Sequence, residues 1–148
     1  MPQPLTNQNF SLHELPGIPA DILTALKARQ IETTLGLLKA APSLDQRRTL
    51  ARSLDLRDQV IGKWFAMADL ARLPAVGTQY CGLLLHCGIH SVTQLAIADA
   101  GRLHRHVLRF HVALLRQKNR CPELVDVMQW IQQAKLLSRA QSSKKPRQ

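Results

Sequence analysis

The chain has 148 residues, 45% of them hydrophobic, so it can bury a core and suits one domain or two small ones. No apolar run approaches the roughly 18 residues of a membrane span, and residues 1–10 have neither the basic nor the apolar region of a secretion signal. Because the three cysteines are an odd number without a paired framework, we expect a reducing compartment and a cytoplasmic protein.

Positive charge is concentrated in the second half of the chain. Residues 1–70 contain 8 Lys and Arg against 7 Asp and Glu, whereas residues 71–148 contain 12 against 3. Nearly all of the formal net charge of +10 therefore lies after residue 70. Such an asymmetry bears on the partners of a protein and not on its fold.

In chain order, the sequence predicts a flexible arm over 1–10 and a first helical unit over 11–70. Ser11 with Glu14, and Ser43 with Gln46, have the spacing of capping boxes that begin helices. The helices expected in this unit cover about 11–15, 19–29, 34–41, 43–54 and 58–70.

A second unit is predicted over 71–137, with a disordered basic tail over 138–148. Gly88 is expected to end a helix in the left-handed region, and Ser91 with Gln94 forms a further capping box. The helices expected here cover about 78–87, 91–96, 102–118 and 122–137. Leu and Ala dominate the apolar positions, which favours an all-α fold.

The two units match each other at a constant offset of 58 residues. Residues 15–19, Leu-Pro-Gly-Ile-Pro, align with residues 73–77, Leu-Pro-Ala-Val-Gly, and the register continues to Ala40 and Ala98. One supersecondary unit has therefore been used twice.

This arrangement resembles the helix-hairpin-helix motif. A turn is followed by a helix, and a Gly-Ile step then leads into a second, capped helix. The chain from about Leu12 to Leu137 is also similar to a tandem helix-hairpin-helix family, domain of unknown function 4332, most closely over Leu70–Lys135. This resemblance implies an all-α fold of two helix-hairpin-helix repeat units, each followed by additional packing helices. It implies little about activity, because the function of the family is unknown and none can be carried over.

Glycines in such turns leave backbone N–H groups facing outward, where they can hold a phosphate oxygen. The turn of the motif has two glycines, and each turn of this chain keeps only one of them. In the first turn the second glycine is replaced by Pro19, which has no N–H to donate. In the second turn the first glycine is replaced by Ala75, which resists a positive φ. Each turn can therefore be a phosphate site or only a connection between helices, and the second turn, with Gly77, Thr78 and Gln79, is the better candidate.

Residues 102–120 contain six Lys and Arg and three His without an acid. On a helix, Arg102, Arg105 and Arg109 fall on one side, and Leu103 and Val107 fall on the side that faces the core. A cationic surface of this kind suits nucleic acid, an acidic protein, a membrane surface, or merely solvent.

Catalytic and metal-binding motifs are absent from the sequence. Cys81 and Cys87 are six residues apart on one helix and face different ways, and Cys121 stands alone, so we expect no metal site. There is no nucleophile elbow, P-loop or dinucleotide fingerprint, so we expect neither an enzyme nor a cofactor nor a small-molecule substrate.

These patterns lead to the hypothesis of a non-catalytic protein that contacts nucleic-acid backbone with low sequence specificity. The alternative is an adaptor that presents the same basic face to an acidic protein partner. The residues expected to make the contact are Gly77, Thr78, Gln79, Arg102, Arg105, Arg109, Arg116, Lys118 and Arg120.

Overall fold

The computed structural model describes residues 6–114 and 121–144, and the side chains of 6–110 and 121–139. Within these residues all regular elements are helices, and the one β interaction is an isolated bridge between Ser11 and Thr33. The elements are a 3₁₀ helix, η1 (Leu12–Glu14), and α1 (Ala20–Ala28), α2 (Thr34–Ala40), α3 (Leu44–Ser53), α4 (Asp58–Ala71), α5 (Gly77–His86), α6 (Val92–Ala96), α7 (Ala100–Leu114) and α8 (Leu124–Lys144). The all-α prediction is confirmed.

The 58-residue offset in the sequence recurs in the backbone hydrogen bonds that end α1 and α5. The N–H of Ile31 donates to the carbonyl of Leu26 at 2.9 Å, and the N–H of Ile89 donates to that of Leu84 at 3.0 Å. All four side chains are buried. The same apolar positions therefore close the same turn in both halves of the chain.

The helices that follow these turns also begin alike. The Thr33 hydroxyl accepts a hydrogen bond from the N–H of Gly36 at 3.0 Å, and the Ser91 hydroxyl accepts one from the N–H of Gln94 at 3.0 Å. Each bond satisfies one of the N–H groups that a helix leaves unpaired at its start. The Ser91 cap predicted for α6 is thus confirmed, and α2 begins with the equivalent bond.

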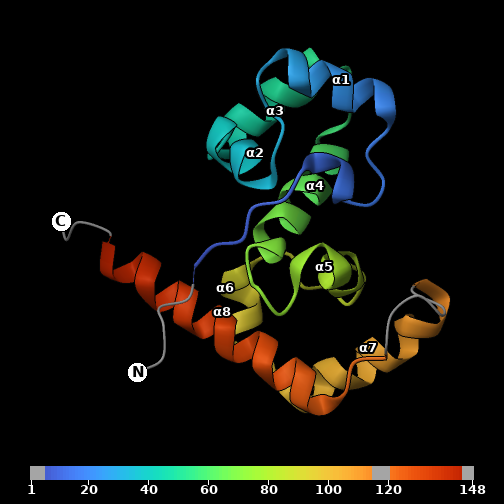
Figure 1. Cartoon of the computed structure of the whole chain (residues 1–148), viewed down its shortest axis with the longest axis vertical. Helices are drawn as coiled ribbons and strands as arrows, with labels where there is room; N and C mark the ends of the chain where they lie inside the picture. The colour runs from blue at the N-terminus through green and yellow to red at the C-terminus, as the bar shows by residue number, and fades with distance from the viewer. Residues whose placement is uncertain (1–5, 115–120, 145–148) are drawn as a thin grey trace.

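Helix α4 connects the two halves of the molecule. In Figure 1 the helices α1, α2 and α3 lie around one end of α4, and α5, α6, α7 and α8 lie around the other. Helix α4 packs against α2, α3 and α5, while α8 packs against α6 and α7. Trp64 on α4 and Trp130 on α8 are both buried.

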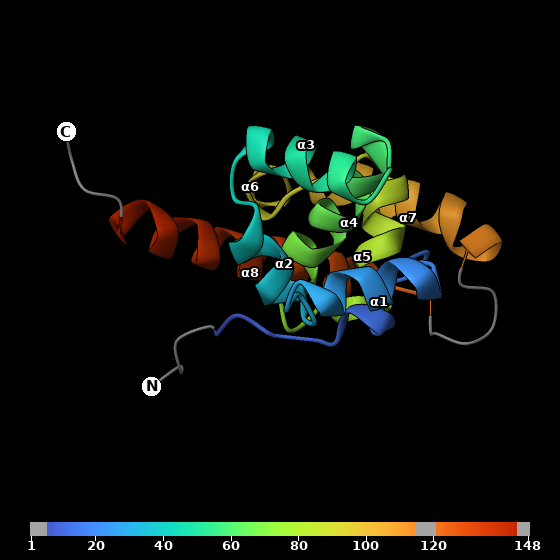
Figure 2. The same cartoon turned by 90° about the horizontal axis from the view of Figure 1, so that it is seen from above.

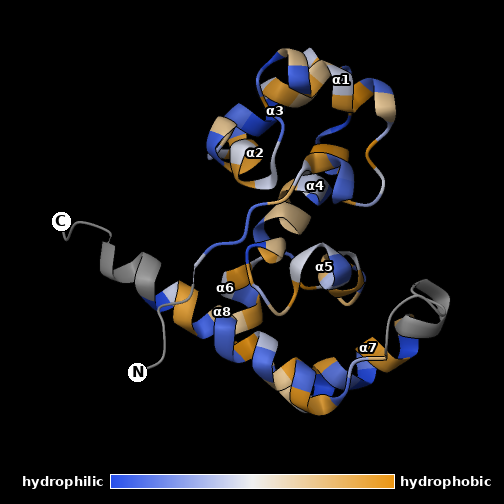
Figure 3. Ribbon diagram, in the orientation of Figure 1, coloured by the Kyte–Doolittle hydropathy of each residue, from blue (hydrophilic) through white to orange (hydrophobic). Residues whose placement is uncertain are grey.

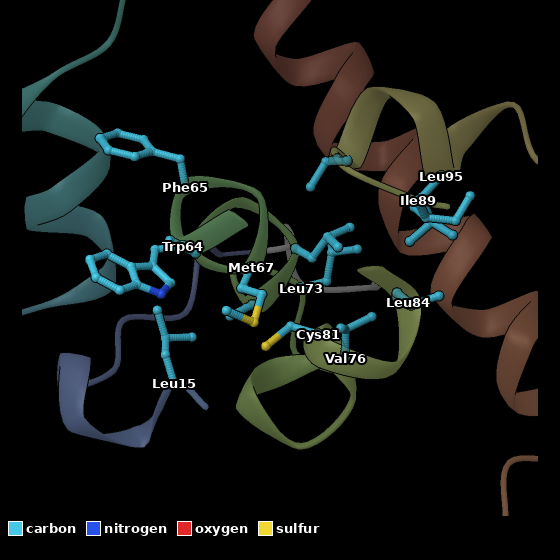
Figure 4. Close-up of a cluster of buried hydrophobic side chains, with 14 of the residues drawn as sticks. Leu15, Trp64, Phe65, Met67, Leu73, Val76, Cys81, Leu84, Ile89 and Leu95 are labelled. Carbon is cyan, nitrogen blue, oxygen red and sulfur yellow. The ribbon is translucent and has the colours of Figure 1, made fainter. Parts of the chain in front are cut away.

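One hydrophobic core runs through both halves. Figure 4 shows it passing from Leu15 and Trp64 in the first half to Leu84 and Leu95 in the second. Side chains of α4, of α5 and of the turn between them lie in the middle of the core. Since neither half buries its apolar face alone, we expect the two to fold as one cooperative unit.

A polar network around Asp69 also joins the halves. One carboxylate oxygen of Asp69 pairs with Nη2 of Arg72 at 2.8 Å, and the other accepts from the N–H of Val92, at the start of α6, at 2.8 Å. Nη1 of Arg72 donates to the side-chain oxygen of Asn7 at 3.3 Å. Because Arg72 is only 5% exposed, these partners offset the cost of burying its charge.

The last residues of the arm predicted over 1–10 make contacts with the rest of the molecule. The N–H of Gln8 donates to the carbonyl of Arg72 at 2.9 Å, and the N–H of Phe10 donates to the Thr34 hydroxyl at 3.1 Å. The ring of Phe10 also packs against the core. These acceptors come from segments distant in sequence, so no local pattern predicts them.

Helix α8 continues to Lys144, into the segment from Ser138 that was predicted to be a disordered tail. No glycine or proline interrupts the chain between Ser138 and Lys144, and the first proline is Pro146. A helix already stabilised by packing can therefore extend over polar residues with good helix propensity. Residues 145–148 lie outside the described part of the chain.

Candidate nucleic-acid interface

Helix α7 carries the predicted basic face. Leu103 and Val107 are buried against the rest of the molecule, whereas Arg102, Arg105 and Arg109 are exposed. The apolar pair is one helical turn apart, so it fixes the rotation of the helix and turns the three arginines toward solvent. Figure 3 shows the resulting alternation of hydrophilic and hydrophobic residues along α7.

These three arginines have no ion-pair partner among the described residues. The ion pairs in that part of the chain are Arg48 with Asp58, and Arg72 with Asp69. The side chains of Arg102, Arg105 and Arg109 therefore keep their guanidinium charge available to an external anion.

The other predicted cations of this segment cannot be placed. Arg116, Lys118 and Arg120 lie outside the described residues, which on this side end with Leu114, the last residue of α7. The helix predicted over 102–118 is thus confirmed over 102–114 and begins two residues earlier than expected, at Ala100. The carboxylate of Asp99 accepts from the N–H of Arg102 at 2.9 Å and caps that start.

Two N–H groups of the second turn already donate hydrogen bonds within the chain. The positive φ of this turn falls at Gly77 (53°), and the Gly77 N–H donates to the carbonyl of Leu73 at 2.9 Å. The N–H of Ala75 donates to Oε1 of Gln133, on α8, at 2.9 Å. The N–H of Gly77 thus already has an acceptor within the chain, and the residue is buried.

The neighbours of Gly77 differ in exposure. Thr78 is half-buried and Gln79 is exposed, so both lie nearer to solvent than Gly77. A ring atom of Phe10 lies 3.6 Å from the position that a Cβ of Gly77 would take. The N-terminal segment therefore contacts this turn, and α5, which begins at Gly77, packs against α7.

The first turn has a different geometry from the second. Its positive φ lies at Gly17 (88°), and Pro19 is the residue that precedes α1. Pro16 packs on α5, where its Cγ lies 3.4 Å from the position of a Cβ on Gly82. This turn therefore contacts the second half of the molecule, which gives it a structural role.

Cys81 and Cys87 are free, poorly reactive thiols. Burial raises the pKa of Cys81 to about 12 and that of Cys87 to about 11, so both remain thiols at neutral pH. The described residues contain no group of three potential ligands that could hold a metal ion.

Sequence reasoning missed a cleft between the two halves, with a volume of about 680 Å³. Its walls include Arg47 on α3, Lys63 on α4, and His86 and His90 at the end of α5 and after it. These residues are up to 43 positions apart, so no spacing rule joins them.

Comparison with known proteins identifies a family and no further relative. Residues 16–137 match the model of a domain of unknown function (DUF4332). A comparison with curated proteins found no match, and neither did a comparison with solved structures. None of the helices in the described residues combines the length and hydrophobicity that crossing a bilayer requires.

Proposed function

The chain belongs to the DUF4332 family, and from that premise we propose that it is a non-catalytic protein that binds nucleic-acid backbone with low sequence specificity. The observation that carries the proposal is the row of three exposed arginines on α7, Arg102, Arg105 and Arg109, which have no acidic partner among the described residues. In this proposal the two halves are a pair of helix-hairpin-helix units. The recurrence of the turn and cap hydrogen bonds at the 58-residue offset supports that assignment.

The physical basis of the proposed binding is neutralisation of phosphate charge. Arg side chains that reach phosphates release condensed counterions, so the affinity falls as salt rises, with a slope of about −0.9 for each phosphate neutralised on duplex DNA. Contacts of this kind position a protein on a strand without reading its bases. Because the N–H of Gly77 is hydrogen-bonded to the carbonyl of Leu73, we assign the phosphate contact to α7 and only a secondary role to Thr78 and Gln79.

A second candidate is an adaptor that binds an acidic protein. Leu108 is 45% exposed on α7 and lies three residues after Arg105. An apolar side chain beside guanidinium groups is common at protein interfaces, where Arg is also enriched. A nucleic-acid backbone gains little from contact with Leu108, so this residue favours a protein partner.

The test compares two variants with the same change in charge. Arg105→Glu with Arg109→Glu reverses the basic face, and Lys27→Glu with Lys39→Glu reverses two exposed cations on α1 and α2. Anisotropy of a labelled random duplex and a labelled single strand is measured between about 50 and 200 mM salt. Circular dichroism verifies that each variant keeps its helicity.

We expect binding that weakens with salt, and the α7 variant should bind about tenfold more weakly or worse, with a salt slope reduced by about 2. The α1 and α2 variant should lose less. Equal losses in the two variants would contradict a localised interface. If neither nucleic acid binds at low salt while polyglutamate does, the adaptor is the better proposal.

A further inference from the structure

None of the residues that line the cleft between the two halves lies on α7 or in the N-terminal segment. The ring of His86, in the cleft wall, lies 6.3 Å from that of Phe110 on α7. The cleft walls come from α3, from α4 and from the chain around the end of α5. In Figure 2, α3 and α6 lie on one side of α4, while α1 and the N-terminal segment lie on the other. A volume of about 680 Å³ is within the roughly 300–1,000 Å³ of ligand-binding clefts.

Arg47 is held in the wall of this cleft without a carboxylate partner in the described residues. Its guanidinium carbon lies 4.6 Å from the centre of the Phe65 ring. Its Nε donates to the carbonyl of Ala41 at 3.2 Å, and its Nη2 donates to the carbonyl of Pro42 at 3.5 Å. These contacts fix the position of the charge, and the remaining N–H groups of the fork can still donate to an anion. The site is thus preorganised for a phosphate or a carboxylate.

Lys63 adds a second positive charge to the cleft, and the nearby acid does not cancel it. Asp69 is the one carboxylate among the described lining residues. Its two oxygens are already engaged by Arg72 and by the N–H of Val92. The charge of Asp69 is therefore balanced by Arg72, and Arg47 and Lys63 leave the cleft positive.

Apolar side chains form the rest of the wall, among them Leu38, Ala66 and Leu85. A cleft with cations beside an apolar surface suits a ligand that combines an anionic group with a flat or apolar part. Inorganic phosphate alone would leave this surface uncovered.

We infer that this cleft binds a phosphate-bearing ligand of about the size of a nucleotide. The phosphate would lie at Arg47 and Lys63, and the base would lie against Ala66 and Leu85. Because its walls come from both halves, such a ligand would also bridge them. The ligand can be a free nucleotide or the phosphorylated end of a strand, and either source has the same chemistry. This site goes beyond the proposed function, since none of its residues lies on α7.

The experiment follows backbone amides of the ¹⁵N-labelled full chain by NMR during titration with AMP and, separately, with inorganic phosphate. Two further probes, a 5′-phosphorylated oligothymidylate and its unphosphorylated counterpart, distinguish a strand end from a free nucleotide. The variant is Lys63→Glu, and the matched control is Lys27→Glu, an exposed lysine on α1. Arg47→Gln serves as a second variant, which removes charge at the fixed guanidinium.

We expect AMP, the phosphorylated strand, or both to shift the amides of Gly62, Ala66 and Ser91 saturably. Binding should be about tenfold weaker in Lys63→Glu, also weaker in Arg47→Gln, and unchanged in Lys27→Glu. Inorganic phosphate should bind more weakly than AMP. The inference is overturned if no probe gives a saturable shift at these amides, if the two lysine variants respond alike, or if phosphate binds as tightly as the nucleotide.

The result of this titration is independent of the test of the proposed function. Arg105→Glu with Arg109→Glu should leave the AMP response of the cleft intact. A protein that binds nucleic acid but shows no shift in the cleft would refute the inference alone, whereas AMP binding without strand binding would refute the proposed function alone.

Discussion

Replacing Asp69 by alanine should destabilise the protein more than replacing an exposed charged residue by alanine does. The substitution removes the partner of a guanidinium that is 5% exposed, and it also removes the acceptor for the N–H of Val92. Arg72 would keep its bonds to the Asp69 carbonyl and to Asn7 but would lose its counter-charge. A buried charge left without compensation is among the costliest defects in a core.

The expected magnitude follows from the two contacts that are lost. A hydrogen bond to a charged group contributes about 1.5–3 kcal/mol, and an acceptor at a helix start contributes about 1 kcal/mol. Since the Asp69 side chain is 25% exposed, water compensates in part, and we expect a loss of about 3 kcal/mol. Domains are stable by only about 5–15 kcal/mol, so the change should be readily measured.

The assay is urea unfolding followed by tryptophan fluorescence, with Arg48→Ala as the control. That variant breaks an ion pair of 3.7 Å between side chains that are 49% and 58% exposed, so the expected loss is below about 0.5 kcal/mol. The milder Asp69→Asn, which keeps a neutral acceptor, should fall between the two variants. An Asp69→Ala loss no larger than that of Arg48→Ala would refute the assignment of Asp69 as the link between the halves.

Three further predictions concern the two halves and the core. Gly88→Ala should lower the free energy of unfolding by about 1 kcal/mol because φ is 87° at this position. Gln30→Gly should raise it by about 0.5 kcal/mol because φ is 63° there. A higher urea midpoint for Gly88→Ala, or a lower one for Gln30→Gly, would contradict this reasoning. Burial raises the pKa of Cys81 from 9.0 to about 12, so the folded chain keeps a proton that the unfolded chain loses. The contribution of this thiol to the free energy of unfolding should therefore fall as pH rises from 9 to 12, and iodoacetamide at neutral pH should label Cys81 only in urea, as read by mass spectrometry. Variants Trp64→Phe and Trp130→Phe each leave one tryptophan to report on one half, and in each of them the fluorescence and circular dichroism transitions should coincide; separate transitions would show that the shared core does not couple the halves.

Local interactions account for what the sequence predicts well. The capping box of α3 is present as expected, with the N–H of Gln46 donating to the Ser43 hydroxyl at 3.1 Å and the N–H of Ser43 donating to Oε1 of Gln46 at 3.1 Å. In the box of α6, Gln94 instead accepts from the N–H of His90 at 2.8 Å. Partners within four residues depend on spacing, and spacing can be read from the sequence.

The exposure of the basic face was predictable for the same reason. Leu103 and Val107 have helical spacing, so their burial places the intervening Arg105 on the outside. The sequence alone therefore determined the helices, the 58-residue repeat and the side of α7 that carries charge. Each of these depends on periodicity along a short stretch of chain.

Only the tertiary structure decided which backbone N–H groups and charged side chains remain available to bind a ligand. Gln133 accepts a hydrogen bond from the N–H of Ala75, 58 residues away, and the ring of Phe10 lies beside Gly77. Arg47, Lys63 and His90 line one cleft. Such contacts are set by how the helices pack, and packing depends on the whole core at once. That is why the second turn looked competent for phosphate in the sequence, and why the cleft left no trace there.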